Sequence, residues 1–280
     1  MPIIYLNGEY LPLEQATVSV EDRGFLFADG IYEVVRFYGG RSFQLEAHLR
    51  RLQHSAEGAH LPLPQVVSDL PSVIERVLAE NDLHDAELYI ECTRGAAHPR
   101  SHPFPADPHP TLLVMPVPIR ALAGHALTRG LSAVTAPDMR WRRCDIKSIM
   151  LLPNVIAKQQ GREKGAFEAI LVRDGIITEG ASTNVFAVIE GSLFTHPADQ
   201  DILGGITRQV VLELAAEIGL GVREESFTLH QLYDAQEVFL TSTTVEVLPI
   251  TQIDGRPVGS GRPGPVTMRL HEAFQTRTGA

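Results

Sequence analysis

Hydrophobic positions in the first half of the chain switch between a period of two and a period near 3.6, the spacings typical of strands and helices. The Asn7-Gly8 pair between two apolar runs predicts a β-hairpin, and Gly39-Gly40 predicts another. From Leu45 onwards the apolar residues recur at helical spacing. The expected elements are a hairpin over 3–11, strands over 31–38 and 41–45, a helix from 45, a helix over 68–81 and strands over 88–93 and 111–117.

The second half continues this mixture after a proline-bearing stretch. The expected elements are a strand over 131–135, a helix over 148–165, strands over 168–172, 185–189 and 192–195, a helix over 206–218, a strand over 236–241 and a hairpin over 253–258. The segment PVPIRALAG at 116–124 interrupts the periodic regions, as linkers do. We therefore expect an α+β protein with an N-terminal domain over 1–118, a linker over 119–124 and a C-terminal domain over 125–280.

Composition narrows the class of protein. Of 280 residues, 44% are hydrophobic and 21% charged, as in ordinary globular enzymes. A net charge of −10 with scattered basic residues disfavours nucleic acids and anionic membranes as partners and favours small molecules. No apolar stretch is long enough to span a membrane, and the first residues do not resemble a secretory signal. The two cysteines, Cys92 and Cys144, suit a reducing compartment, so we expect a cytoplasmic enzyme.

Four polar clusters stand at the expected ends of elements: DIKS at 145–148, TEGASTN at 178–184, GGITR at 204–208 and TSTT at 241–244. Each alone is common as a surface lysine, a helix cap or a turn. In combination, the turn that opens a helix at Thr207 offers N–H groups to an anion, and the hydroxyls of 242–244 are expected to close around the same phosphate. Glu179 suits a protonated ring nitrogen, and Lys147 can form an imine. These are the minimum groups needed to hold pyridoxal phosphate.

The same segments resemble, in order and separation, the signature segments of the fold-type IV aminotransferases. The early segments DRG at 22–24, FADGIYE at 27–33 and HLRRL at 48–52 resemble that family too. The resemblance covers nearly the whole chain. It implies a smaller N-terminal α/β domain, a larger C-terminal domain with a mixed, barrel-like sheet, and pyridoxal 5′-phosphate as the cofactor.

The loop from Arg94 to Pro105 distinguishes the members of this family. Its Arg100 and His102 match the loop that, in D-amino-acid aminotransferases, enters the partner subunit's site and binds the substrate carboxylate with a tyrosine matching Tyr32. A guanidinium fork suits a carboxylate. The resemblance implies a homodimer that transfers the amino group of a D-amino acid such as D-alanine to 2-oxoglutarate or pyruvate. The alternatives are a branched-chain L-aminotransferase, an aminodeoxychorismate lyase of the same fold and, more remotely, a non-enzymatic α+β binding protein.

The resemblance also assigns residue roles. Lys147 is expected to form the Schiff base and to act as the general base. The implied cofactor-binding set is Arg51, Arg140, Glu179, Ser182, Ile206, Thr207, Ser242 and Thr243, and the implied substrate-binding set is Tyr32, Arg100, His102, Thr243 and Thr244. No catalytic metal is expected, because His48, His54 and His60 are spaced by six and do not share a helix face, and His98, His102 and His109 lack acidic or thiolate partners at ligand spacing.

Overall fold

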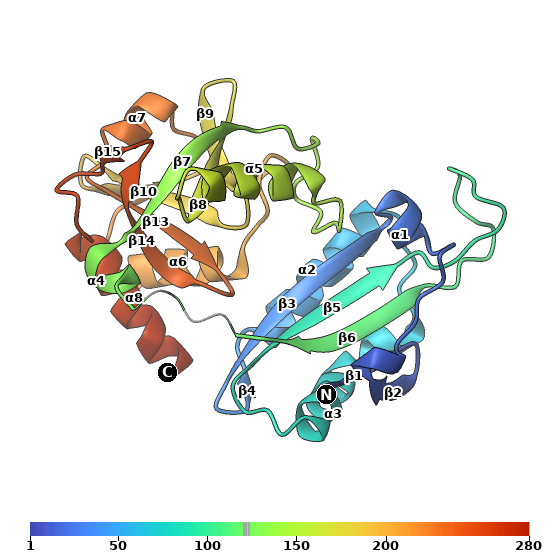
Figure 1. Ribbon diagram of the computed structural model, residues 1–280. Helices are drawn as coiled ribbons and strands as arrows, with labels where there is room; N and C mark the ends of the chain where they lie inside the picture. Colours follow the sequence, from blue (N-terminus) through green and yellow to red (C-terminus); the bar gives the residue numbers. More distant parts are fainter. Residues whose placement is uncertain (120–121, 123, 280) are drawn as a thin grey trace. The chain divides into compact units, whose positions relative to one another are not determined.

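The computed structural model describes residues 1–119, 122 and 124–279, and they form two compact units (Figure 1). Unit 1 is Met1–Ile119 with Ile146–Met150. Unit 2 is the described part of Arg120–Asp145 with Leu151–Ala280. Three residues of the expected linker, 120, 121 and 123, lie outside the described residues, so the linker over 119–124 stays a prediction.

Unit 1 is built on a six-stranded antiparallel sheet of order β2-β1-β6-β5-β3-β4. Its elements are β1 Ile3–Leu6, β2 Glu9–Pro12, a 3₁₀ turn Leu13–Gln15, α1 Arg23–Phe27, β3 Gly30–Tyr38, β4 Arg41–Ser42, α2 Leu45–Gly58, a 3₁₀ turn Gln65–Asp69, α3 Leu70–Glu80, β5 Ala86–Thr93 and β6 Thr111–Val117. The predicted β1–β2 hairpin is confirmed, with Asn7 and Gly8 at positive φ. Such φ values are what this turn requires and what this residue pair tolerates.

The core of unit 1 lies between this sheet and the helices α2 and α3 (Figure 1). Alternation along β3 sends Ile31, Val35 and Phe37 into that core and leaves Tyr32 on the other face, half-buried. The predicted strand over 41–45 shrinks to two residues, because α2 begins at Leu45 and takes that side chain to the core. Helices α2 and α3 and strands β5 and β6 contribute further members of this core, among them Leu52, Ala56, Val73, Ile74, Val77, Leu88, Ile90, Leu112 and Val114.

The segment Ile146–Met150 joins unit 1 through the backbone of β3. Tyr32 N–H donates to Lys147 O at 3.0 Å, and Ile149 N–H donates to Gly30 O at 3.0 Å. Lys147 N–H donates to Ser55 Oγ of α2 at 3.0 Å. The predicted helix over 148–165 is therefore wrong in its first turn. The observed helix is α5, Leu152–Glu163, with Pro153 in its first turn, where proline is favoured because the N–H group it lacks would have no partner in the helix.

Unit 2 is built on a nine-stranded mixed sheet of order β12-β11-β10-β13-β14-β7-β8-β9, with β15 paired to β14. Its elements are α4 Ala126–Arg129, β7 Leu131–Pro137, α5, β8 Glu168–Arg173, β9 Ile176–Gly180, β10 Asn184–Ile189, β11 Ser192–Thr195, α6 Ile206–Glu217, β12 Val222–Glu224, α7 Leu229–Tyr233, β13 Glu237–Ser242, β14 Glu246–Ile253, β15 Arg256–Pro257 and α8 Pro265–Thr278. Three pairs are parallel, namely β11–β12, β14–β7 and β7–β8. The expected α+β architecture with a mixed C-terminal sheet is confirmed.

Buried side chains fix the position of α6 in unit 2. Val210, Val211, Leu214 and Ala215 are all at most 3% exposed, and the helix packs against α8 and β13. Burial of each larger aliphatic side chain contributes about 1.5–3 kcal/mol, so the start of α6 is held firmly. No helix in the described part of the chain has the length and apolar character needed to cross a membrane.

Candidate active site

Lys147 lies beside Tyr32 in unit 1. Its Nζ stands 4.2 Å from the centre of the Tyr32 ring, and the side chain is only partly buried. The Tyr32 ring also packs on Tyr89, with ring centres 5.6 Å apart. Because the backbone of Lys147 is bonded on both sides, to β3 and to α2, the amine projects from a fixed segment. The structure thus brings the predicted imine-forming lysine and one predicted substrate-binding residue together.

Arg51, a predicted phosphate-side residue, is held by a buried carboxylate. Glu33 accepts from Arg51 Nε at 2.7 Å and from Arg51 Nη2 at 2.8 Å, and His48 Nδ1 lies 2.7 Å from the same carboxylate. Burial acts to raise the pKa of Glu33, but Arg51 and His48 outweigh it and lower that pKa to about 2. The guanidinium is therefore held in one orientation by a partner that is charged at neutral pH.

Arg100 and His102 lie exposed in the loop between β5 and β6. Both side chains pack around the Phe27 ring of unit 1: the Arg100 guanidinium is 4.4 Å from its centre and the His102 ring is 5.3 Å away. The two predicted carboxylate-binding residues therefore contact the same aromatic ring, and both are exposed.

Glu179, on β9 of unit 2, is a buried carboxylate, and the residue is 5% exposed. It accepts from Arg140 Nη1, from Asn184 Nδ2 at 2.9 Å and from Leu203 N–H at 3.2 Å. Arg140 also binds a second carboxylate, because its Nε and Nη2 donate to Asp138 at 2.9 and 2.7 Å. Burial raises the pKa of Glu179, and Arg140 only partly opposes that rise. A further positive group beside this carboxylate would favour its charged form.

The start of α6 has the features of an anion site. Gly205 is its N-cap and supplies no side-chain bond, so the first N–H groups of the helix lack an intrahelical partner. Thr207 is buried in that first turn. A Cβ at residue 205 would lie 2.0 Å from Asn184 Oδ1, so only glycine permits this close turn. These N–H groups and the helix dipole suit a phosphate, and the site therefore fits pyridoxal phosphate.

The remaining predicted site residues of unit 2 are Ser182, Ser242, Thr243 and Thr244. Ser182 is exposed, and its hydroxyl donates to Glu168 at 2.9 Å rather than to Glu179. Ser242 ends β13, and its hydroxyl lies 3.1 Å from that of Thr244 in the following turn, with Thr243 between them. These hydroxyls form the expected turn, and the roles of all four residues stay predictions.

Two residues of this region were absent from the predicted set. Asn184 joins Glu179 to the turn at Gly205, because it also donates to Leu203 O at 2.9 Å. Thr241 faces Asn184 across the β10–β13 pairing, is 1% exposed, and its hydroxyl finds no hydrogen-bond partner within the described residues. Both lie inside the quoted sequence clusters, but nothing in the sequence distinguishes them from neighbouring polar residues.

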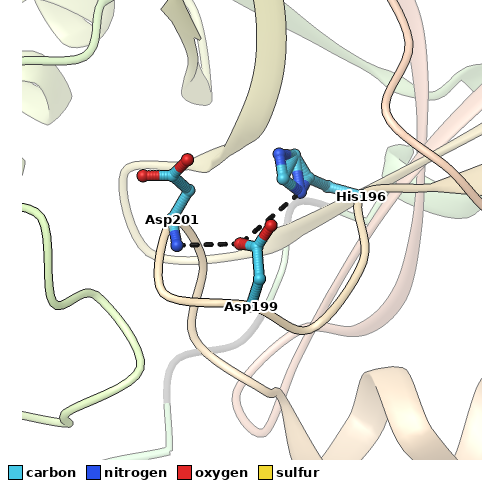
Figure 2. Close-up of side chains that lie close together, drawn as sticks. All are labelled: His196, Asp199 and Asp201. Carbon is cyan, nitrogen blue, oxygen red and sulfur yellow. Dashed lines mark hydrogen bonds and ion pairs between the residues drawn. The ribbon is translucent and has the colours of Figure 1, made fainter.

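One group in unit 2 has the composition of a metal site. His196, Asp199 and Asp201 have ligand atoms within 4.8 Å of one another (Figure 2). However, Asp201 is ion-paired with Arg173, and Asp199 Oδ1 accepts from Asp201 N–H at 2.8 Å. A cation would have to compete with the guanidinium for Asp201, and the cluster is better explained as the packing of a turn.

Comparison with known proteins identifies the family. The amino-transferase class IV family matches residues 30–253. The chain is 44% identical to a D-alanine aminotransferase of Bacillus licheniformis, over 97% of this chain and 95% of that protein. It is 42% identical to one of Listeria monocytogenes, over 97% and 94%. Among solved structures, a branched-chain aminotransferase of Escherichia coli has a TM-score of 0.91 at 31% identity, covering 98% of this chain and 94% of that one.

The chain belongs to the class IV aminotransferases, and it is a pyridoxal-phosphate-dependent transaminase. A second branched-chain aminotransferase, solved with pyridoxamine 5′-phosphate, has a TM-score of 0.91 at 29% identity, with 99% of this chain and 94% of that one covered. The non-enzymatic alternative is therefore excluded, and the predicted cofactor is confirmed.

Proposed function

We propose that the chain transfers the amino group of a D-amino acid, with D-alanine as a donor, to a 2-oxo acid such as 2-oxoglutarate or pyruvate. The identity of 44% to a D-alanine aminotransferase over 97% of the chain carries this proposal. The neighbouring, exposed Arg100 and His102 support it, since both can donate to a carboxylate. The branched-chain alternative has weaker support, because the branched-chain enzymes named above are 29–31% identical.

The residue roles in this proposal follow from the chemistry of the side chains. Bound pyridoxal phosphate supplies an electron-withdrawing ring that stabilises negative charge on the substrate α-carbon. Lys147 would hold the cofactor through Nζ, and once the substrate amino group has displaced it, the same amine would take the α-proton and later return it. Glu179 provides the negative charge for the ring nitrogen, and Arg140 fixes that carboxylate.

In this proposal the cofactor phosphate and the substrate carboxylate are bound by separate sets of residues. The N–H groups of Ile206 and Thr207 bind the phosphate, in keeping with the uncapped start of α6. The further phosphate-side and ring-side residues in the proposal are Arg51, Ser182, Ser242 and Thr243. The substrate carboxylate is bound by Tyr32, Arg100 and His102, with Thr244 and Thr243 nearby. A homodimer in which the loop from Arg94 to Pro105 completes the partner's site, and a cytoplasmic location, belong to the same proposal.

The substrate class is tested by the colour of the cofactor. We expect D-alanine to remove the visible absorbance of the protein loaded with pyridoxal phosphate, because the cofactor becomes aminated, and pyruvate to restore it. L-leucine should leave the spectrum unchanged. A response to L-leucine without one to D-alanine would contradict the D-amino-acid proposal and favour the branched-chain alternative.

The role of Lys147 is tested by borohydride reduction of the loaded protein followed by peptide mass spectrometry. The label should appear on residue 147, and Lys147→Ala should lose both the label and transamination while the melting temperature of the cofactor-free protein stays near that of the parent. Lys164→Ala, at the exposed end of α5, is the matched control and should keep both. Turnover retained by Lys147→Ala would remove the assignment.

A further inference from the structure

Arg23 binds the backbone of the loop that carries Arg100 and His102. Its guanidinium donates to three successive carbonyl oxygens, at 2.6 Å to Ser101, 3.0 Å to His102 and 3.4 Å to Pro103. Arg23 is the first residue of α1 and only 5% exposed, although the loop residues it binds are exposed. One buried side chain thus holds three peptide groups of an otherwise open loop.

Asp29 fixes the orientation of Arg23. Arg23 Nε donates to Asp29 Oδ2 at 2.8 Å, and Arg94 Nε donates to the same oxygen at 2.8 Å. Arg94 is 2% exposed and also donates to the carbonyls of Ala59 at 3.0 Å and His60 at 2.7 Å, just after α2. The two guanidinium groups share one carboxylate, so the loop is tied to the core of unit 1 by charged hydrogen bonds.

The same short helix supports the side chains of the loop. Phe27 ends α1, four residues after Arg23, and its ring lies under Arg100 and beside His102. The start of the loop is bound as well, because Arg23 N–H donates to Gly95 O at 2.9 Å and Ala97 N–H donates to Glu21 O at 3.3 Å. The segment from Glu21 to Asp29 therefore forms a platform for the loop.

We propose that Arg23 is a positioning residue for substrate carboxylate recognition, because it fixes the backbone of 101–103 and so holds Arg100 and His102 in one arrangement. This inference rests on the proposed function. An exposed loop without such a clamp would have to be ordered when substrate binds, which weakens binding. Lysine cannot substitute, since a single ammonium lacks the fork that reaches three carbonyls and a carboxylate together.

The test compares Arg23→Lys with Arg41→Lys, an exposed arginine of β4 that serves as the matched control. We expect Arg23→Lys to raise the KM for D-alanine about tenfold while kcat changes less than about threefold, the pattern of lost binding rather than lost chemistry. Hydrogen exchange of the peptide over 94–105 should accelerate, and affinity for pyridoxal phosphate should match that of the control. A merely structural role for Arg23 would lower cofactor affinity and melting temperature without separating KM from kcat.

Arg100→Leu separates the inference from the proposed function. If Arg100→Leu raises the KM but Arg23→Lys has the same KM as Arg41→Lys, the inference about Arg23 is overturned and the proposed function stands. An unchanged KM in Arg100→Leu would overturn the carboxylate role and the inference together. If the Arg23 variant does not fold, Phe27→Leu provides the test. It should raise the KM for D-alanine about two- to fivefold, because that is the loss of affinity expected when an exposed cation–π contact is removed. An unchanged KM in Phe27→Leu would count against the platform.

Discussion

The anion site at the start of α6 can be tested by adding one methyl group at residue 205. Gly205 has φ −66° and ψ 136°, a conformation that any residue adopts, so the backbone itself does not demand glycine. The demand is steric, because a Cβ would stand 2.0 Å from Asn184 Oδ1 and 3.3 Å from the Cβ of Arg208. Gly204 is the matched control, since a Cβ there would meet nothing within 4 Å.

The strain in Gly205→Ala cannot be relieved by rotating Asn184. That side chain is 5% exposed, and its Nδ2 donates to Glu179 and to Leu203 O, both at 2.9 Å. The turn must therefore move, and it would carry the N–H group of Ile206 away from the proposed phosphate position. Loss of one hydrogen bond to a charged group costs about 2 kcal/mol, which corresponds to about a 30-fold rise in the Kd for pyridoxal phosphate.

The assay is a titration of the cofactor-free protein with pyridoxal phosphate, followed by visible absorbance. Gly204→Ala should bind the cofactor like the parent chain, and Gly205→Ala should bind it about 30-fold more weakly. Equal affinities of the two variants would refute the reasoning, since the added methyl group would then have displaced nothing that binds the cofactor.

Two further changes probe the buried carboxylates. Glu179→Gln should keep the cofactor bound and lower kcat with D-alanine about 100-fold, the usual cost of removing one preorganised charge, and a parent-like kcat would contradict its role. The pKa of Glu33 is lowered from 4.5 to about 2 in the folded chain. Its charge therefore adds about 3 kcal/mol to the free energy of unfolding above pH 4.5. This contribution is lost as the pH falls towards 2. The melting temperature of Glu33→Gln should therefore decrease less steeply than that of the parent as the pH falls from 4.5 to 2. Equal slopes of melting temperature against pH would refute the linkage.

Local periodicity was sufficient to predict most elements, but not those whose stability comes from distant partners. The strands over 88–93, 111–117 and 185–189 were found within two residues of their ends, because each is a compact apolar run. In contrast, β9, the main part of β14, and α8 were not predicted. The strand β9 ends in TEG, a poor strand sequence, and it forms because β8 pairs with it and Ile177 packs in the core of unit 2.

Around Lys147, too, local sequence patterns could not predict a structure that depends on distant partners. The sequence predicts a helix from Ser148, yet the backbone of 147–149 is bonded to β3 and Ser55, which lie about 90–120 positions earlier. Family motifs led to the prediction of Lys147 and Glu179 without any of this information. They suggested no role for Asn184 or Arg23, because the hydrogen bonds of these residues to distant segments leave no distinctive local pattern.

The charge balance around the buried carboxylates supports the role proposed for Glu179 beside a cationic ring. Burial acts to raise the pKa of Asp29, Glu33, Asp138 and Glu179 alike. For the first three, hydrogen-bonded arginines outweigh burial and the pKa falls below its usual value. Glu179 has only Arg140, whose other nitrogens are committed to Asp138, and its pKa stays raised. Of these four carboxylates it alone has a raised pKa, and the protonated ring nitrogen that the proposed function places beside it would lower that pKa.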